Sequence, residues 1–399
     1  MTLKAATVPS QLGPYDVGPK IGGGGMATVY VGRRRDAGSD VVAIKVIRDE
    51  LADDTNYIHM FLDEAKVLSR LSHPDIIVTR DFGIAEGVRF IAMELLLGRS
   101  LIDVFERANE RDVRMPLDLA ELIAMRVARA LDYAHGLQVI HRDVNPTNIF
   151  LTYDGRVKLI DFGLAKSVGR LAKSGEGIVK GKVPYLSPEQ IDEKPFDHRT
   201  DIYALGATLW EITAGRRLFK RATDIETIQA IRAQDIPDPR TFVEGLYPDA
   251  LWTIVRRALE RDPAARYASG EAMALDLEVL LEKHGRKADM AVVLAEWLDD
   301  LFPGERAKQE AWLAKVSAIH TPEPKTMAPP APVAEVPAPD PVAVSPQQPV
   351  VVPAEQAIAT PVTEQPTITG PAHHPLRALL ALVATVGFFV VLALVFQRC

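Results

Sequence analysis

Three oxygen-bearing side chains in residues 141–163 could hold a metal ion beside a reacting hydroxyl group. The segment begins His-Arg-Asp-Val-Asn-Pro-Thr-Asn-Ile-Phe-Leu, passes a polar Tyr-Asp-Gly turn and ends Val-Lys-Leu-Ile-Asp-Phe-Gly. Short apolar runs on either side of the turn predict a small hairpin. The segment has Asp143 and Asn148 at one end and Asp161 at the other. Carboxylate and amide oxygens brought together in this way suit a hard divalent cation with a hydroxyl nucleophile beside it.

A glycine-rich stretch near the N-terminus could bind phosphate groups. Residues 21–30 read Ile-Gly-Gly-Gly-Gly-Met-Ala-Thr-Val-Tyr, between two β-prone runs. Glycines let the backbone close over a ligand without interference from Cβ atoms, and exposed amide groups there can bond phosphate oxygens. A flexible hairpin turn has the same composition, so the stretch alone does not establish phosphate binding. It precedes the strand-like run Val-Ala-Ile-Lys that ends at Lys45.

These motifs together resemble the eukaryotic-like (Hanks-type) serine/threonine protein kinases found in bacteria. The resemblance covers about residues 15–281, with the motifs in the family's order. It implies an α+β, bilobal protein-kinase fold with a small antiparallel β lobe carrying one main helix, and a larger, mostly helical lobe. It also implies transfer of the ATP γ-phosphate to Ser or Thr of protein substrates, with autophosphorylation, and the cofactors ATP and Mg²⁺. A second Asp-Phe-Gly string at 81–83 reads as a strand and turn, where we expect no metal.

The resemblance assigns a role to each chemical group. Asp143 would orient the substrate hydroxyl and accept its proton, Asn148 and Asp161 would bind Mg²⁺, and Lys45 would hold the α- and β-phosphates. The glutamate that pairs with this lysine in the family matches Glu64. It lies beside the apolar stripe of a helix predicted over 55–71, whereas Glu50 and Asp63 are the alternatives that we expect to be exposed.

Further nucleotide contacts are expected from the glycine-rich loop, the lysine strand and the strand-like run 88–97. That run resembles the connection between the two lobes, with Met93 at the back of the adenine pocket and backbone groups around 94–96 bonding the adenine edge. The family's third loop glycine is Ala27 here, a mild departure. The expected ATP-binding residues are Ile21, Gly22, Gly23, Gly24, Gly25, Met26, Ala27, Thr28, Val29, Ala43, Lys45, Glu64, Met93, Glu94 and Leu96.

Structural supports are expected from three charged residues. The run Pro-Tyr-Leu-Ser-Pro-Glu-Gln at 184–190 resembles the motif that closes the family's activation segment, and it places Glu189 against a basic partner, for which Arg266 is the candidate. Asp201 matches the aspartate that braces the catalytic-loop backbone. An amphipathic helix predicted over 116–135 would carry the catalytic hairpin, and a helical pattern over 250–282 would complete the larger lobe.

Two departures from the family pattern face the same site. The family's lysine two positions after the catalytic aspartate is Asn145 here, and its threonine after the glycine of the substrate-facing loop is Lys182. We hypothesise an exchange in which Lys182 supplies the cation that Asn145 lacks, which adds Lys182 to the catalytic set of Asp143, Lys45 and Asn148. The alternative is two unrelated losses.

The activation segment, residues 161–189, contains no threonine. Its unassigned hydroxyl groups are Ser167 and Ser174, and Arg142 could pair with a phosphate there. We expect Ser174 to be the regulatory site rather than Ser167, because Ser174 lies in the middle of the loop.

Composition limits the location and the partners. The net charge of −7 argues against nucleic acid, and the single cysteine, Cys399, excludes an intrachain disulfide and suits a reducing compartment. The first twelve residues lack the apolar core of a signal peptide. The expected organisation is an N-terminal extension (1–14), a kinase domain (15–285), accessory helices (286–320), a Pro-rich disordered linker (321–375) and a transmembrane helix (376–397).

The last two segments predict a tail anchor. The linker is rich in Pro, Ala and Val with almost no aromatic residues, so it cannot form a core. Residues 378–396 are apolar and uncharged, and as a helix they would span ~28 Å, close to the hydrocarbon core of a bilayer. A buried soluble helix is the alternative. We therefore expect a single-pass protein of the inner (cytoplasmic) membrane with its kinase domain in the cytoplasm. The accessory helices either pack on the larger lobe or dock a partner.

Two other functions stay open. A nucleotide-binding pseudokinase scaffold could recruit partners at the membrane, and the Asn145 and Lys182 changes keep this alternative. A small-molecule kinase is weakened by the full-length activation segment, which suits protein substrates. The sequence names neither the substrates nor the activating signal, and it leaves a homodimer open.

Overall fold

The computed structural model describes residues 9–24, 27–36, 40–52, 54–162, 182–243, 245, 247–283 and 289–319. All of them belong to one structural unit, Met1–Thr326, and a second unit, Met327–Cys399, falls outside the described residues. The predicted linker and membrane segment, and the predicted site residues Gly25, Met26, Ser167 and Ser174, also lie outside them.

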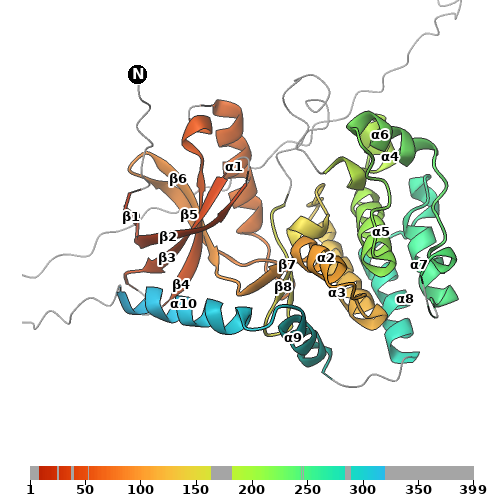
Figure 1. The fold of residues 1–399 in the computed structure, drawn as a ribbon. Helices are drawn as coiled ribbons and strands as arrows, with labels where there is room; N and C mark the ends of the chain where they lie inside the picture. Colours follow the sequence, from red (N-terminus) through yellow and green to blue (C-terminus); the bar gives the residue numbers. More distant parts are fainter. Residues whose placement is uncertain are drawn as a thin grey trace, which may run out of the picture. The chain divides into compact units, whose positions relative to one another are not determined.

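Antiparallel strands form the sheet of the small lobe (Figure 1). Within the described residues the sheet has six strands in the order β1-β2-β3-β4-β6-β5. β-Branched residues dominate its strand β4, as suits a pleated and half-buried surface. Among the described residues the long helix of this lobe is α1 (Thr55–Leu68), whose Phe61 and Ala65 pack against Ile47 and Ile91. The strands are β1 (Gln11–Leu12), β2 (Tyr15–Gly23), β3 (Ala27–Arg34), β4 (Val41–Ile47), β5 (Thr79–Ala85) and β6 (Val88–Glu94).

The predicted hairpin is a second, three-stranded sheet. Strand β8 (Ile149–Thr152) pairs with β7 (Gly98–Ser100) on one side and with β9 (Val157–Leu159) on the other, all antiparallel. Ile149 lies opposite Leu159, so the start of β8 and the end of β9 meet at the open end of the hairpin. Asn148 ends a 3₁₀ turn, η2 (Pro146–Asn148), just before β8. Asn148 and Ile160, the neighbour of Asp161, therefore come together, and the Ile160 amide donates to the Asn148 carbonyl oxygen at 2.9 Å.

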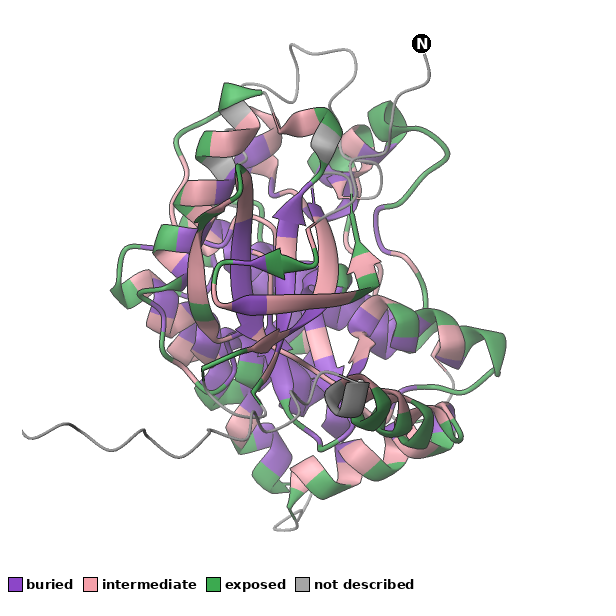
Figure 2. Ribbon diagram, turned by 90° about the vertical axis from the view of Figure 1, so that its left-hand side faces the viewer, coloured by how far each residue is buried: buried purple, intermediate pink, exposed green. Residues whose placement is uncertain are grey.

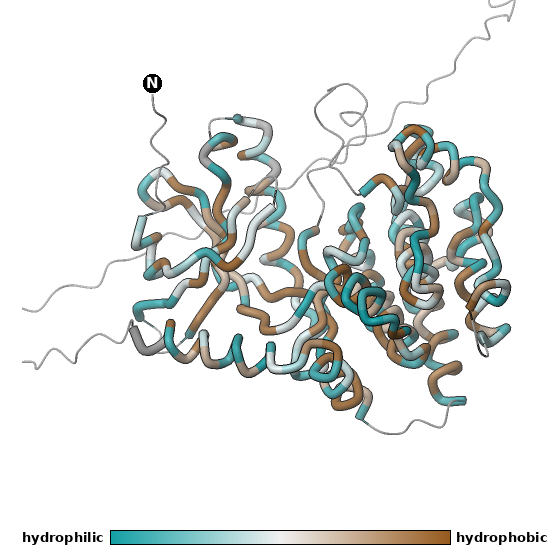
Figure 3. The backbone as a smooth tube through the Cα atoms, in the orientation of Figure 1, coloured by the Kyte–Doolittle hydropathy of each residue, from teal (hydrophilic) through white to brown (hydrophobic). Residues whose placement is uncertain are grey.

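Helices build the large lobe around α3 (Leu117–Gly136), and every residue of the apolar face predicted for α3 is buried. Figure 2 shows the buried residues gathered inside this lobe and along the inner strands of the small lobe, and Figure 3 shows that hydrophobic residues occupy the same places. The other helices of the described residues are α2 (Leu101–Glu110), α4 (Pro188–Ile191), α5 (Arg199–Ala214), α6 (Asp224–Ala233), α7 (Asp249–Ala258) and α8 (Gly270–Lys283). Short 3₁₀ turns lie at η1 (Asp49–Leu51), η4 (Val183–Tyr185), η5 (Pro239–Thr241) and η6 (Pro263–Ala265).

The two accessory helices are α9 (Met290–Leu301) and α10 (Glu305–Ile319). α9 packs on the large lobe as expected, with Leu294, Leu298 and Leu301 buried. α10 differs from that expectation, because it continues past the sheet of β7 to β9 and lies along the strands of the small lobe in Figure 1. Among the helices of the described ranges, none combines the length and apolar character needed to cross a membrane.

Candidate active site

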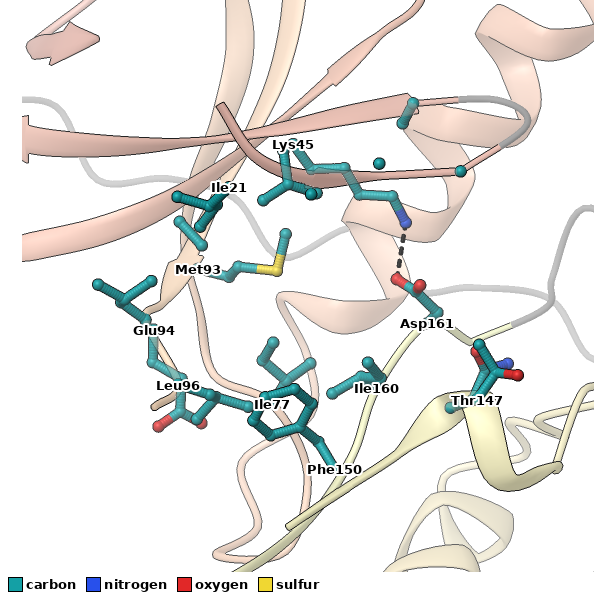
Figure 4. A pocket seen from close by; sticks show the side chains of 18 of the residues that line it. Ile21, Lys45, Ile77, Met93, Glu94, Leu96, Thr147, Phe150, Ile160 and Asp161 are labelled. Carbon is teal, nitrogen blue, oxygen red and sulfur yellow. Dashed lines mark hydrogen bonds and ion pairs between the residues drawn. The ribbon is translucent and has the colours of Figure 1, made fainter. Parts of the chain in front are cut away.

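A cleft between the two lobes collects most of the residues that the sequence singled out (Figure 4). Ile21 from β2 lines its upper side in Figure 4, and Met93 from the end of β6 lies deeper. Ala27 and Val29 from β3 also line the cleft. Ile77, Phe150 and Ile160 line the lower side. This arrangement gives a flat ligand an apolar contact on each face.

Most of the expected ATP-binding residues line this cleft. Those that do are Ile21, Gly22, Gly23, Gly24, Ala27, Val29, Ala43, Lys45, Glu64, Met93, Glu94 and Leu96. Thr28 is not among the residues that line it, and its assignment stays a prediction. Side chains alternate between the faces of a strand, so the residue between Ala27 and Val29 points to the other face. Gly25 and Met26 lie outside the described residues.

The cleft also contains residues that the sequence did not single out. Leu97 and Gly98 follow β6 in the connection between the lobes, and Asp103 lies in the first turn of α2. Their place after the strand predicted to connect the lobes could have indicated them, as it did Leu95, which also lines the cleft. Gln309 and Trp312 come from α10, far along the chain, where no local pattern pointed to the cleft. The predicted site residues Asn148, Asp161 and Lys182 also line the cleft, and the remaining lining residues are Lys20, Ile47, Tyr57, Phe61, Ile77, Arg99, Thr147, Phe150 and Ile160.

Lys45 joins two carboxylates at the inner end of the cleft. Its Nζ lies 2.8 Å from Glu64 Oε1 and 2.8 Å from Asp161 Oδ1, and Figure 4 shows the second contact. Burial acts to lower the pKa of Lys45, but the charges of Asp161 and Glu64 outweigh burial and raise this pKa above its ordinary value. Burial acts to raise the pKa of Asp161, and Lys45 outweighs it and holds this pKa low. The site therefore keeps a fixed cation beside an ionised carboxylate.

Asp143 is held by several donors. Its Oδ1 accepts from Asn145 Nδ2 at 3.2 Å, and its Oδ2 accepts from Asn148 Nδ2 at 2.9 Å and from Lys182 Nζ. Asn145 also caps the 3₁₀ turn, since its Oδ1 accepts from the Thr147 amide at 2.9 Å. Asp143 is not among the residues that line the cleft, but its carboxylate is held by two that are, Asn148 and Lys182.

His141 supports this loop from below. Its Nδ1 accepts from the amide of Asp143 at 3.2 Å, and its Nε2 lies 3.2 Å from the carbonyl oxygen of Ile160. These two contacts suit a neutral ring with its hydrogen on Nε2. Burial lowers the pKa of His141 in spite of the carboxylates of Asp201 and Asp143, which agrees with a neutral ring.

Asp201 braces the same loop from α5, as predicted. Its two carboxylate oxygens accept from the amides of His141 and Arg142, both at 2.8 Å. His135 Nε2 lies 2.8 Å from Asp201 Oδ2. Arg142 has a φ of 64°, in the left-handed region that non-glycine residues seldom adopt. The carboxylate thus holds a backbone turn that is intrinsically unfavourable.

Arg142 was predicted to pair with a phosphorylated serine. Its guanidinium lies 5.6 Å from the centroid of the Phe196 ring, and its Nε is buried without a hydrogen-bond partner among the described residues. Ser167 and Ser174 lie outside the described residues, so the regulatory assignment stays a prediction.

Asn148 and Asp161 fit a hard divalent cation. The hydrogen bonds of the Asn148 side chain to Asp143 are both donated by Nδ2, to the carbonyl oxygen at 2.8 Å and to Oδ2 at 2.9 Å. This orientation leaves its amide oxygen as the ligand atom, in the same cleft as the ionised carboxylate of Asp161. In the described part of the chain no group of three or more His, Cys, Asp or Glu residues could hold a metal ion. Substrate phosphate oxygens and water would have to complete the coordination.

Comparison with known proteins agrees with this geometry. The sequence profile of the protein kinase domain matches residues 15–277. The tyrosine-protein kinase MasK of Myxococcus xanthus is 33% identical over 317 residues, which cover 77% of this chain and 49% of that protein. The serine/threonine-protein kinase PrkC of Bacillus subtilis is 31% identical over 270 residues, which cover 68% of this chain and 41% of that protein. This chain therefore matches about half or less of the length of these relatives.

A solved structure has the same fold. The kinase domain of PknI from Mycobacterium tuberculosis superposes with a TM-score of 0.53 at 28% sequence identity. The match covers 70% of this chain and 99% of that domain.

Proposed function

Because this chain belongs to the protein kinase family, we propose that the whole protein transfers the γ-phosphate of ATP to serine or threonine residues of protein substrates, itself included. One observation carries the proposal: the Lys45–Glu64 ion pair, Asp161, Asn148 and Asp143 lie together at one cleft. This is the full set that positions ATP and a hydroxyl group for phosphoryl transfer.

Different residues bind the phosphates of ATP and accept the proton of the acceptor hydroxyl. Lys45, held by Glu64, supplies positive charge to the phosphates, and Asp143 orients the acceptor hydroxyl and takes its proton. Asn148 and Asp161 would hold Mg²⁺, which neutralises phosphate charge when it is bound. The Asp201 brace fixes Asp143 through the backbone of His141 and Arg142, so the base needs little rearrangement before the reaction.

The experiment uses the full-length chain with Mg-ATP and a mixture of protein acceptors, and it maps phosphate by mass spectrometry. We expect phosphoserine and phosphothreonine with the wild type and a loss of about 10²- to 10⁴-fold with Asp143→Asn. ATP bound without any transferred phosphate would favour the pseudokinase scaffold. Phosphotyrosine as the main product would contradict the serine/threonine assignment, and the name of the relative MasK makes that measurement necessary.

We propose further that Lys182 replaces the lysine that the family carries at position 145. Asn145 is buried and turns its side chain back to the loop, where it bonds Asp143 and caps the 3₁₀ turn. Lys182 reaches Asp143 from the segment before α4, and about a third of its side chain is exposed to the cleft. A cation so close to the catalytic carboxylate is placed to stabilise charge that develops on the transferred phosphate.

A reciprocal exchange tests this role. We expect Lys182→Thr to lower kcat by about 10²- to 10³-fold, the loss usual for one preorganised electrostatic contact. The double variant Lys182→Thr with Asn145→Lys should recover much of that loss. Lys194→Ala, at an exposed ion pair with Asp192, is the control and should leave kcat unchanged. Wild-type kcat in Lys182→Thr would mean that the two substitutions are unrelated.

Regulation by phosphate is part of the proposal. Arg142 is the basic partner that we assign to phosphorylated Ser174, because its guanidinium Nε is buried without a hydrogen-bond partner in the described residues. Ser174→Ala should abolish activation by autophosphorylation, whereas Ser167→Ala should retain it. The reverse result would transfer the role to Ser167.

We also propose that residues 378–396 anchor the protein in the cytoplasmic membrane through the tether 321–375, with the kinase domain on the cytoplasmic side where ATP is available. The support is the uncharged apolar run itself. Val383→Arg together with Val386→Arg should release the protein from the membrane fraction, because each arginine costs about 2.5 to 3.5 kcal/mol at a helix centre. Release of the wild type by alkaline carbonate would contradict the anchor. Protein substrates, and a homodimer, remain the partners that this reading expects.

A further inference from the structure

The helices that follow the kinase domain are anchored on the large lobe. The carbonyl oxygen of Ala291 in α9 would lie 1.8 Å from a Cβ at Gly155, the turn residue of the β8–β9 hairpin, whose φ is +79°. Arg111 at the end of α2 donates to the carbonyl oxygen of Asp300 at 2.5 Å and to that of Leu301 at 3.2 Å. Together with the buried leucines of α9, these contacts fix the point from which α10 starts.

α10 forms hydrogen bonds with the backbone that connects the two lobes. The side-chain amide of Gln309 accepts from Gly98 N at 3.1 Å and donates to Gly98 O at 3.3 Å, although 211 residues separate them. Arg99 donates to Glu305 at 2.5 Å and lies 5.1 Å from the centroid of the Phe302 ring. Gly98 and Arg99 both line the cleft, so these contacts fix the edge of the cleft at the connection between the lobes.

The same face of α10 extends from the hinge to the small lobe. Trp312 follows Gln309 by three residues, about 4.5 Å along the helix axis, and both side chains line the cleft together with Ile21 and Asp103. Val316 lies one further turn on, where its Cγ1 would be 3.9 Å from a Cβ at Gly18 of β2. Figure 3 shows hydrophobic and hydrophilic residues alternating along α10. One helix thus contacts the hinge, the cleft and the small lobe.

We propose that α10 forms part of the nucleotide site. Trp312 packs against the bound nucleoside as the outer wall of the site, and Gln309 fixes the backbone of Gly98, in the connection between the lobes, beside it. The inference rests on the proposed function, because it takes an adenine nucleotide as the ligand. An aromatic ring that lines a cleft with apolar walls adds contact area to the base or ribose. Docking of α10 and binding of the nucleotide therefore stabilise each other, since coupling between two binding events is reciprocal.

The test measures the Kd of the full-length chain for a fluorescent ADP analogue and for ADP that displaces it. We expect Trp312→Ala and Gln309→Ala each to weaken binding about tenfold, within the usual range of coupling between sites. Trp312→Phe keeps an aromatic side chain at this position. Its Kd for ADP should therefore stay within about threefold of the wild-type value, a smaller change than the tenfold loss expected for Trp312→Ala. The matched control is Lys315→Ala, on the exposed face of the same helix, which should bind like the wild type.

Hydrogen exchange at the Gly98 amide gives a second readout. Its hydrogen bond to Gln309 predicts slow exchange in the wild type, still slower exchange with ADP, and faster exchange in Gln309→Ala. Wild-type ADP affinity in both Gln309→Ala and Trp312→Ala would overturn the role of α10 and leave the proposed function intact. An equal loss in Lys315→Ala would also overturn it, because the effect would then come from the helix as a whole. A wild type that binds no nucleotide would overturn both proposals.

Discussion

Arg266 and Glu189 form a fully hydrogen-bonded ion pair inside the large lobe, 77 residues apart in the chain. Nη1 and Nη2 of Arg266 donate to the two carboxylate oxygens of Glu189 at 2.6 and 2.7 Å. The guanidinium also donates to the carbonyl oxygens of Glu260, Arg199 and Arg261. The pair thus connects the start of α4 and the start of α5 to the turn before α8.

The Glu189–Arg266 pair predicts a large stability loss when one partner is removed. Arg266→Ala leaves a buried carboxylate without its cation, so we expect the free energy of unfolding to fall by about 3–5 kcal/mol. Urea unfolding followed by circular dichroism measures the change. Arg306→Ala, which removes an exposed ion pair with Asp299 and Glu310, is the matched control and should cost about 0–1 kcal/mol. Similar losses in both variants would contradict a special role for the buried pair.

Glu64 predicts a loss of activity without a loss of fold. Glu64→Gln removes the charge that holds Lys45 while Asp161 still binds it, so the lysine is drawn toward the metal ligand and away from the phosphates. We expect kcat/KM to fall by roughly tenfold or more, because misplacement of a phosphate-binding group by about 1 Å is costly. Steady-state kinetics measure the effect, and the urea midpoint should change little. Glu50→Gln is the control, since Glu50 is exposed and pairs with Arg48.

Asp201 predicts a coupled effect on backbone order and rate. Asp201→Asn puts an NH₂ group where one of the two carboxylate oxygens now accepts from the amides of His141 and Arg142. A buried amide then loses its acceptor, at a cost of about 1–3 kcal/mol, and the left-handed turn at Arg142 loses its support. We expect faster hydrogen exchange at both amides together with a lower kcat. Unchanged exchange with a lower kcat would contradict the bracing role.

The sequence predicted these supports because each belongs to a motif with a distinctive spacing. The motifs predicted the positions of Lys45, Glu64, Glu189 and Asp201. The spacing of apolar residues predicted the helix α3. A buried carboxylate such as that of Glu189 requires a charged partner, so its partner Arg266 could be named as well.

Features that depend on contacts between distant parts of the chain could not be predicted from the sequence. Gln309 and Trp312 reach the cleft only because α9 is anchored on the hairpin, and no local pattern encodes a contact over 211 residues. Thr28 is absent from the cleft lining because a strand turns every second side chain away, which a motif of consecutive residues does not encode. The inward turn of Asn145, a cap for the 3₁₀ turn, was also absent from the sequence argument.

His141 predicts a specific dependence of stability on pH. Its folded pKa lies below the ordinary value of 6.5, since burial outweighs the nearby carboxylates of Asp201, Asp143 and Asp161. Between the folded pKa and about 6.5, the unfolded chain binds a proton at this ring that the folded chain does not. The stabilisation from the neutral ring is therefore complete above pH 6.5 and decreases as the pH falls from there toward the folded pKa.

His141→Phe should remove this part of the pH dependence. At pH 7.5 the variant leaves the Asp143 amide and the Ile160 carbonyl without their ring partners, so we expect it to be less stable than the wild type by about 1–3 kcal/mol. As the pH is lowered below 6.5 the wild type should lose stability faster than the variant, and the difference between them should shrink. Urea unfolding of both proteins at a series of pH values measures it, with the NMR titration of the His141 ring as a direct check. A difference that stays constant toward acid pH would mean that folding leaves the pKa of this ring unchanged, and a difference that grows would mean that folding raises it; either result would contradict the prediction.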